Sequence, residues 1–349
     1  MKYILCVTAV LMSCVYVRAQ QPGTGSPSEN VPSGVVNPLL SSGADPYSFY
    51  KDGYYYYTNS LQNRLVIWKT RSLGDLRHAE RDTIFTPPPG TPYSHELWAP
   101  EVMFLRGKWY AYFAADDGSN DHHRIYVLEN PSPDPMKGQW TMKGKVADPA
   151  ADRWAIDADV IDYKGQLYIT WSGWRDDTNG EQDIFIARLS DPWTIEGHRA
   201  MISVPTFDWE KHGDLHNTGN PPHVSVNEGP QFLAHNGRMF IVFSASGCWT
   251  DFYSLGLLSL SDNNLMDPTA WSKRPEPVFK EDTANGVYAP GHNSFFTSPD
   301  GKQDWILYHA NSERDQGCGG HRSPRAQPFT WKDDGTPDFG VPVKTGRLP

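Results

Sequence analysis

The sequence predicts an all-β fold, specifically a five-bladed β-propeller. Long helical periodicity is absent, and 29 Pro and 30 Gly residues would interrupt long helices. A strand pattern rich in aromatic residues instead follows a polar turn five times, at GYYYYT (53–58), GKWYAYFAA (107–115), GQLYITWSG (165–173), GRMFIVFSA (237–245) and GKQDWILYHA (301–310). Two further strand-like runs flank each of these, and the segments between units have room for a fourth strand. Repeats of this size with about four short strands are typical of propeller blades.

The first residues have the features of a secretory signal peptide. Lys2 precedes the apolar run YILCVTAVLMSCVYV (3–17), which is too short to span a bilayer comfortably, and small residues surround Arg18. We therefore expect residues 1–19 to be a signal peptide and residues 20–36, rich in Gly, Pro and Ser, to be a flexible leader. Residues 37–349 would form one propeller domain, because blades bury their faces only against neighbouring blades.

The net charge of −10 argues against nucleic acid or an anionic membrane surface as the partner. Aromatic residues make up 13% of the chain, including 13 Trp and 17 Tyr. Flat rings cover the apolar face of a sugar well, although most of these rings would serve an all-β core. The composition thus suits a soluble protein with a neutral carbohydrate as its ligand, and we expect a secreted monomer.

Two cysteines remain outside the signal peptide, Cys248 and Cys318. An even pair in an exported chain indicates one disulfide, and two buried free thiols are the alternative.

Candidate site residues emerge when the units are aligned on their turn glycine. Asp45 and Asp157 lie eight residues before that glycine, whereas Glu228, His292 and Trp98 lie nine residues before it. One topological place, the start of the first strand of each blade, therefore carries a carboxylate, an imidazole or an indole. Because the first strands surround the central channel, these side chains should converge at one end of it.

Converging carboxylates without a nucleophilic Ser or Cys indicate acid–base chemistry. Glycoside hydrolysis needs one protonated carboxyl group for the leaving oxygen and one ionised group to activate water or attack carbon. A third carboxylate nearby raises the pKa of the acid through like-charge repulsion. The alternative is that these acids cap strand ends or hold a cation.

The sequence resembles glycoside hydrolase family 43, a family of five-bladed propellers. The resemblance runs from about Asn37 to the C-terminus and is strongest to the branch of exo-acting 1,5-α-L-arabinofuranosidases. The pieces that carry it are NPLLSSGADPYSFYKDGYYYYT, ELWAPEVMFLRGKWYAYFAA, WAIDADVIDYKGQLYITWSG, NEGPQFLAHNGRMFIVFSA and YAPGHNSFFTSPDGKQDWILYHA, together with ENPSPDP, SASGCWTD and GCGGHRSPR.

The resemblance implies a role for each acid. Asp45 in GADPYSF matches the general base, Glu228 in NEGPQF the general acid, and Asp157 in AIDADV the residue that orients and tunes the acid. Asp159 stands where the family pattern has no catalytic carboxylate, so it is not chosen. The family inverts the anomeric centre, which implies that base and acid carboxyls lie roughly 6.5–9.5 Å apart.

The same resemblance suggests residues for substrate and metal binding. Trp98 in ELWAP and Arg322 in GHRSPR would contact the sugar, with core packing and an outer salt bridge as the respective alternatives. Ala44 and Phe49 would help to wall the pocket. His292 in APGHNS would lie beside a calcium or sodium ion in the channel, held largely through water because calcium prefers oxygen ligands. The alternative is a histidine that is simply hydrogen-bonded in the channel. No organic cofactor is expected.

Two polar stretches are interpreted as solvent-exposed turns. His122, His123 and Arg124 form a polar turn rather than a metal site. The acids Asp116 and Asp117 follow a strand, where paired acids need no partner.

The predicted function is that of an exo-acting α-L-arabinofuranosidase that acts on plant cell-wall arabinan, or on arabinoxylan. A β-xylosidase or endo-arabinanase of the same family is the nearest alternative, and a non-catalytic carbohydrate-binding propeller is the alternative from another class. Retention of all three carboxylates favours an enzyme. The long connection at residues 194–224 would build the wall that an exo-acting pocket requires.

Overall fold

The computed structural model describes residues 34–214 and 224–348, and the chain there is all-β. The predicted signal peptide (1–19) and residues 20–33 of the predicted leader lie outside the described residues. Three of the sheets have four strands each. They consist of β2 (Ala44–Lys51), β3 (Tyr54–Ser60), β4 (Leu65–Thr70) and β5 (Glu80–Phe85); β6 (His95–Leu105), β7 (Lys108–Asp116), β8 (Arg124–Asn130) and β9 (Thr141–Val146); and β18 (Tyr288–Thr297), β19 (Asp304–Asn311), β20 (Ser323–Trp331) and β21 (Pro337–Asp338).

An eight-stranded sheet lies between the second and the last of these. It consists of β10 (Ala155–Tyr163), β11 (Gln166–Gly173), β12 (Glu181–Asp191), β13 (Thr194–Ser203), β14 (Ser225–His235), β15 (Arg238–Ala245), β16 (Ser254–Leu260) and β17 (Trp271–Lys273). Only a two-residue parallel pairing joins β12 to β14, so the sheet divides into two antiparallel sets of four strands. The segment predicted as a long connection therefore begins with the outer strand β13, which is a correction to the sequence interpretation.

Short elements complete the structure. Strands β1 (Val36–Asn37) and β22 (Gly346–Arg347) pair with each other, which brings the two ends of the described chain together. Within the described parts of the chain, four 3₁₀ turns lie in connections, namely η1 (Leu73–His78), η2 (Asn120–His122), η3 (Asp208–Glu210) and η4 (Pro268–Ala270). No helix among the described residues is long and apolar enough to cross a membrane.

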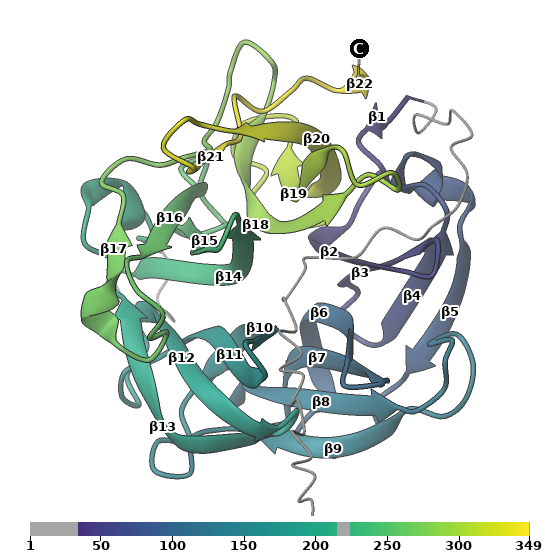
Figure 1. Cartoon of the computed structure of the whole chain (residues 1–349), viewed down its shortest axis with the longest axis vertical. Coiled ribbons are helices and arrows are strands. Elements are labelled where there is room, and N and C mark those ends of the chain that lie inside the picture. Colours follow the sequence, from purple (N-terminus) through teal and green to yellow (C-terminus); the bar gives the residue numbers. More distant parts are fainter. Residues whose placement is uncertain (1–33, 215–223, 349) are drawn as a thin grey trace, which may run out of the picture.

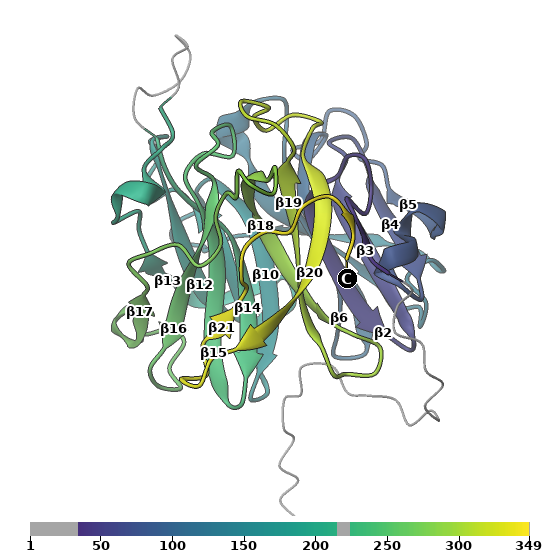
Figure 2. The same cartoon turned by 90° about the horizontal axis from the view of Figure 1, so that it is seen from above.

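The sheets stand around a common centre, with β2, β6, β10, β14 and β18 nearest to it (Figure 1). Seen from its edge, the molecule has strands that run between its two faces, with loops at both ends (Figure 2). The five aromatic-rich runs predicted from the sequence are β3, β7, β11, β15 and β19, the second strand of each set.

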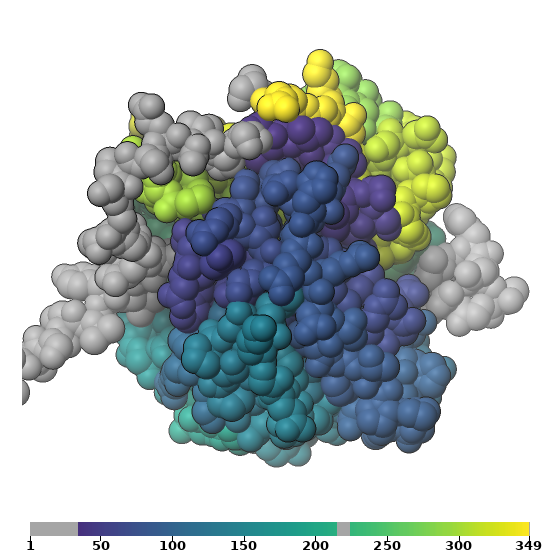
Figure 3. Space-filling view, turned by 90° about the vertical axis from the view of Figure 1, so that its right-hand side faces the viewer, coloured from purple at the N-terminus to yellow at the C-terminus, as the bar shows by residue number. Residues whose placement is uncertain are grey.

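Apolar clusters fill each gap between neighbouring sets of strands. One example is the cluster in which Tyr56 and Ile67 of the first sheet meet Trp109 of the second. A corresponding cluster joins the last sheet to the first, where Trp305 and Leu307 pack with Tyr55. Figure 3 shows the C-terminal chain, in yellow, against the N-terminal sheet, in purple. The sheets therefore bury their faces only against neighbours, in a closed cycle.

Each innermost strand is interrupted by a β-bulge near the same end. Each of these bulges in β2, β6, β10, β14 and β18 has a residue with a left-handed backbone, at Asp45 (φ 56°), Ala99 (φ 44°), Asp157 (φ 59°), Gly229 (φ 53°) and His292 (φ 48°). Strands β6 and β18 have a second register shift, which contains a further left-handed residue, Glu96 (φ 47°) and Ala289 (φ 48°) respectively. A left-handed conformation costs a residue other than glycine roughly 1–2 kcal/mol. This cost is typical of bulges that redirect a side chain next to a functional site.

Candidate active site

A pocket of about 610 Å³ opens at the end of the molecule where these bulges lie. Its lining comes from all five sets of strands and includes seven of the eight residues predicted for the site, namely Ala44, Asp45, Trp98, Asp157, Glu228, His292 and Arg322. The equivalent positions in the repeats therefore converge, as the turn-glycine alignment predicted.

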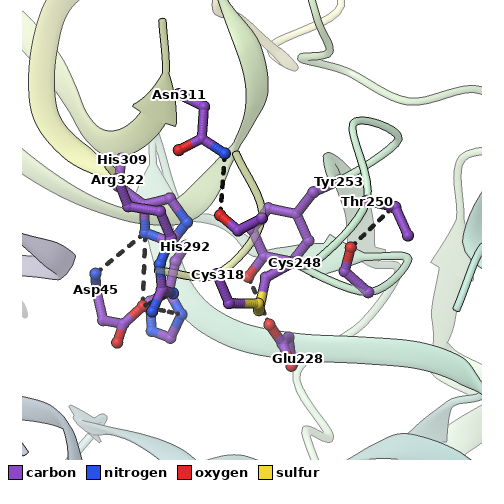
Figure 4. Close-up of a disulfide and its surroundings, with 12 residues drawn as sticks. Asp45, Glu228, Cys248, Thr250, Tyr253, His292, His309, Asn311, Cys318 and Arg322 are labelled. Carbon is purple, nitrogen blue, oxygen red and sulfur yellow. Dashed lines mark hydrogen bonds and ion pairs between the residues drawn. A yellow bond between two sulfur atoms is a disulfide. The ribbon is translucent and has the colours of Figure 1, made fainter. Parts of the chain in front are cut away.

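Asp45 lies among groups that favour its ionised form. Its Oδ1 is 3.2 Å from an Arg322 guanidinium nitrogen and 3.2 Å from His292 Nδ1, and Ser60 Oγ donates to Oδ2 over 2.5 Å. Burial opposes ionisation, but His292, Arg322 and His309 together hold the pKa of Asp45 well below its usual range. The Asp45 backbone N–H donates to His309 Nδ1 over 3.1 Å, which fixes the carboxylate and the imidazole relative to each other. Figure 4 shows Arg322, His292 and His309 grouped around Asp45.

Glu228 and Asp157 form a buried pair whose surroundings favour the protonated form of the carboxyl group. An oxygen of each carboxyl and a ring nitrogen of His292 lie within 4.8 Å of one another. Burial raises the pKa of Glu228 to about 7, against the effect of the Tyr253 hydroxyl, which donates to Oε1 over 2.6 Å. Burial and then the neighbouring Glu228 raise the pKa of Asp157 well above its usual value. Two buried carboxyls this close favour a shared proton over two negative charges.

The bulges explain how these acids reach one place despite their different distances from the turn glycine. Asp45 and Asp157 occupy the left-handed position itself, whereas Glu228 precedes the left-handed Gly229. The N–H of Gly229 donates to Asp157 Oδ2 over 2.9 Å, so the backbone of one bulge holds the carboxylate of another. A pocket that holds one firmly ionised carboxylate and one carboxyl that is protonated near neutral pH is equipped for general acid–base chemistry.

The walls of the pocket differ in character. On one side lie three indole rings, of Trp98, Trp154 and Trp174. On the other side lies the disulfide between Cys248 and Cys318, which settles the open question of the two thiols in favour of a bond. The cysteines belong to the loops after β15 and β19, and Figure 4 shows the bond beside Glu228 and Tyr253.

Phe49 is the one predicted site residue that lies outside the pocket. It packs edge-to-face on Trp109, with ring centroids 5.7 Å apart, within the apolar clusters on either side of the second sheet. The reason is distance along the strand, because Phe49 follows Asp45 by four residues, or about 13 Å at 3.3 Å per residue. Ala44, directly before Asp45, does line the pocket.

The two stretches interpreted as exposed polar turns, 116–117 and 122–124, are only partly exposed, which corrects the interpretation of the sequence. His122 and Asp117 are exposed and lie 2.9 Å apart. His123 and Asp116, in contrast, are buried, with 0% and 2% of their side chains exposed, and lie 3.2 Å apart. Nothing in the local composition separates these two pairs, since burial comes from the long-range packing of Trp98 and Trp154 against His123.

Several residues that sequence reasoning missed support the acids. Ser60 and His309 hold Asp45, and Tyr253 holds Glu228. Ser60 is the last residue of β3 and pairs directly with Ala44. Its position at the end of the strand therefore could have predicted that it lies near Asp45. Tyr253 follows the SASGCWTD stretch quoted for the family resemblance, but nothing in the sequence links it to Glu228.

The predicted metal residue, His292, offers a poor donor set for directly bound calcium. Calcium takes six to eight oxygen ligands. The described groups within reach of one another are one imidazole and the carboxyls of Asp157 and Glu228, and the imidazole is already 3.2 Å from Asp45. The residues therefore do not fit a direct calcium cage, and no chemical step below depends on an ion.

An all-β scaffold with three buried carboxyls converging in an aromatic-walled pocket defines the class of acid–base carbohydrate hydrolases. The family model described as "Glycosyl hydrolases family 43" matches residues 35–337. The chain belongs to this family, and it is therefore a glycoside hydrolase by family.

Three similar proteins are named as arabinofuranosidases. The chain is 36% identical over 351 residues to an extracellular exo-α-(1→5)-L-arabinofuranosidase of Streptomyces avermitilis, covering 98% of this chain and 70% of the relative. A protein of the same description from Streptomyces chartreusis is 37% identical over 290 residues, covering 81% and 84%. Among solved structures, an α-L-arabinofuranosidase from Lactobacillus brevis has a TM-score of 0.82 at 38% identity, covering 89% of this chain and 97% of its own.

Proposed function

We propose that this protein is an exo-acting α-L-arabinofuranosidase that releases terminal arabinofuranosyl units from α-1,5-linked arabinan. The observation that carries the proposal is the pairing of an ionised Asp45 with a Glu228 whose pKa is raised to about 7 in one pocket. The names of the relatives from both Streptomyces species support this choice of sugar and of exo action.

In this proposal each acid has one role. Asp45 accepts a proton from the attacking water, and Arg322 keeps it ionised for that purpose. Glu228 donates its proton to the leaving oxygen, and burial of this carboxyl beside Asp157 keeps the pKa of both groups high. Water attacks from the face opposite the leaving group, so the product anomer is inverted.

Exo action is supported by the two unlike walls of the pocket. The disulfide Cys248–Cys318 and the indoles of Trp98, Trp154 and Trp174 confine it to about 610 Å³, a volume suited to a few sugar rings. An endo-arabinanase would need a groove open at both ends. A β-xylosidase of the family would use the same acids on another sugar, and a binding-only propeller would not need an ionised and a protonated carboxyl side by side.

The finer points of architecture also belong to this proposal. The five sets of four strands are the blades of a five-bladed propeller, and residues 37–349 form one catalytic domain.

The protein is secreted and monomeric and acts on arabinan or arabinoxylan of plant cell walls without an organic cofactor. The proposal also places a hydrated cation, calcium or sodium, beside His292, and metal analysis of protein purified without chelators should detect it.

Replacement of the proposed acid tests the mechanism. E228Q is compared with the native protein on debranched arabinan and on an aryl α-L-arabinofuranoside, with E129Q, a variant of a half-buried carboxylate on β8, as the control. We expect kcat on arabinan to fall by roughly 10²–10⁴, and less on the aryl substrate, whose leaving group needs less protonation. Unchanged turnover on both substrates would refute the role of Glu228.

Product analysis tests the substrate and the mode of action. Linear arabinan, arabinoxylan and xylo-oligosaccharides are incubated with the native protein and the products are separated by chromatography. Arabinose alone from linear arabinan is the expected result. A ladder of arabino-oligosaccharides would indicate endo action, and xylose from xylo-oligosaccharides would indicate a xylosidase.

A further inference from the structure

His123 lies at the centre of the aromatic wall, although it belongs to a loop of polar sequence between β7 and β8. Its ring stacks on the indole of Trp98, with centroids 4.0 Å apart and an angle of 25° between the planes. Trp154 meets the same ring edge-on at 6.3 Å. Trp154 in turn stacks on Trp174 at 5.0 Å and 9°. Three of the four pocket-lining indoles, those of Trp98, Trp154 and Trp174, thus form one continuous row of rings with His123.

Protein oxygens hold the imidazole from both sides. Nδ1 lies 3.2 Å from a carboxylate oxygen of Asp116 and 3.2 Å from the carbonyl oxygen of Asn120, and Nε2 lies 3.2 Å from the carbonyl oxygen of Glu96. Each ring nitrogen faces an acceptor, so the nitrogen that carries the proton can donate in either tautomer and the ring loses its freedom to rotate. Asp116 also accepts from the N–H of Gly118 over 2.9 Å, so the carboxylate itself is fixed.

The same loop anchors the neighbouring indole. The Nε1 of Trp154 donates to the carbonyl oxygen of Asn120 over 2.9 Å, and the backbone N–H of Ala155 donates to the carbonyl oxygen of His123 over 3.2 Å. Trp98, in contrast, is only partly buried, and its Nε1 donates to the exposed Glu96 over 3.0 Å. The indole packs against the buried cluster that contains Trp154 and Trp174, and it stacks face to face on the ring of His123.

We propose that Asp116 and His123 are a positioning pair that holds Trp98 at the angle needed to cover the sugar in the pocket. The pair does not touch the reacting atoms, so its contribution is to substrate affinity. This inference rests on the proposed function, since it names residues that serve the same pocket. It also assigns a role to a loop that is not part of the acid–base machinery.

The chain contains a matched control for this pair. Asp117 and His122 are neighbours of Asp116 and His123 in the sequence and make a similar contact of 2.9 Å, but 46% and 61% of their side chains are exposed. Neither lines the pocket. H122A and D117N therefore change the charge and composition of the same loop without changing the aromatic row.

The first experiment measures kcat and KM of H123A, D116N and the controls H122A and D117N on arabino-oligosaccharides. An aromatic pair is worth about 0.5–1.5 kcal/mol, so H123A should raise KM by roughly 2- to 13-fold with kcat nearly unchanged. D116N should raise KM by less, and the controls should not change it. A KM for H123A equal to that of H122A would overturn the proposal.

A double-mutant cycle tests whether His123 acts through Trp98. In the W98A background, H123A should add almost no further increase in KM, whereas fully additive effects would refute positioning of this indole. If H123A does not fold, the same cycle is run with D116N, which preserves side-chain size.

A spectroscopic readout separates this inference from the proposed function. The difference in near-ultraviolet circular dichroism between native protein and W98F gives the contribution of Trp98. H123A should reduce that contribution and H122A should not. If the native protein hydrolyses no arabinofuranoside, the proposed function fails while this measurement still decides the positioning. An unchanged Trp98 contribution in H123A would overturn it.

Discussion

Replacing Tyr253 with Phe isolates the hydrogen bond that opposes protonation of the proposed acid. The Tyr253 hydroxyl is buried, donates to Glu228 Oε1 over 2.6 Å and stabilises the ionised form of that carboxyl. Its loss should raise the pKa of Glu228, because the charged form loses a stronger hydrogen bond than the neutral form does. Phe fills nearly the same volume, so the packing of the ring against His309, 5.7 Å away and parallel, is retained.

The size of the effect follows from the strength of the bond. A hydrogen bond to a charged group contributes about 1.5–3 kcal/mol, and 1.36 kcal/mol corresponds to one pKa unit. The pKa of Glu228 should therefore rise from about 7 to roughly 8–9 in Y253F. Because the acid must be protonated to act, the alkaline limb of the pH profile moves upward with it.

The assay is the pH dependence of kcat/KM on an arabino-oligosaccharide, which reports the free enzyme. Y112F is the matched control, since the Tyr112 hydroxyl is equally buried but donates to the carbonyl oxygen of Pro192, away from the pocket. We expect the alkaline limb to move in Y253F only. An alkaline limb that stays in place, or moves to lower pH, would refute the assignment of this limb to Glu228.

Three further predictions concern charge and stability. R322A should move the acidic limb of kcat/KM to higher pH, because the guanidinium that lowers the pKa of the proposed base is lost; an unmoved acidic limb would contradict this. Reduction of Cys248–Cys318, which are 70 residues apart, should lower the free energy of unfolding by about 2–4 kcal/mol, measured with urea and with and without reductant. K273M should destabilise the fold by about 3–5 kcal/mol in urea, because it removes the cationic partner of Glu210, whose side chain is 0% exposed, and leaves it only the hydrogen bonds from Thr206, Phe207 and Asn227; a change below 1 kcal/mol would argue against a charged pair.

Much of the architecture was predictable because the strands can be recognised from local sequence patterns. The aromatic-rich second strand of each set follows a glycine turn, and that pattern depends on neighbouring residues alone. The same turns placed Asp45, Asp157 and Glu228 at equivalent positions, and the structure brings them into one pocket. The offset of one residue between Glu228 and the two aspartates was visible, but its cause, a bulge with Gly229 in the left-handed position, was not.

The parts that could not be predicted depend on contacts between distant segments. Phe49 shares a strand with Asp45, yet the distance along that strand places it in the core. Asp116 and His123 belong to a sequence of typical loop composition, and only the approach of the Trp98 ring shows that they are buried. Short-range patterns therefore located the catalytic candidates, whereas burial within the loops that surround them required the three-dimensional structure.

If Asp45 activates water as a base while Glu228 donates a proton, the glycosidic bond is cleaved in a single displacement. Proton nuclear magnetic resonance of the first product released from an α-L-arabinofuranoside, recorded before mutarotation, tests this mechanism directly. We expect β-L-arabinose to appear first and the α anomer only later. Initial release of the α anomer would show retention, make a carboxylate the nucleophile, and contradict the role of Asp45 as a base.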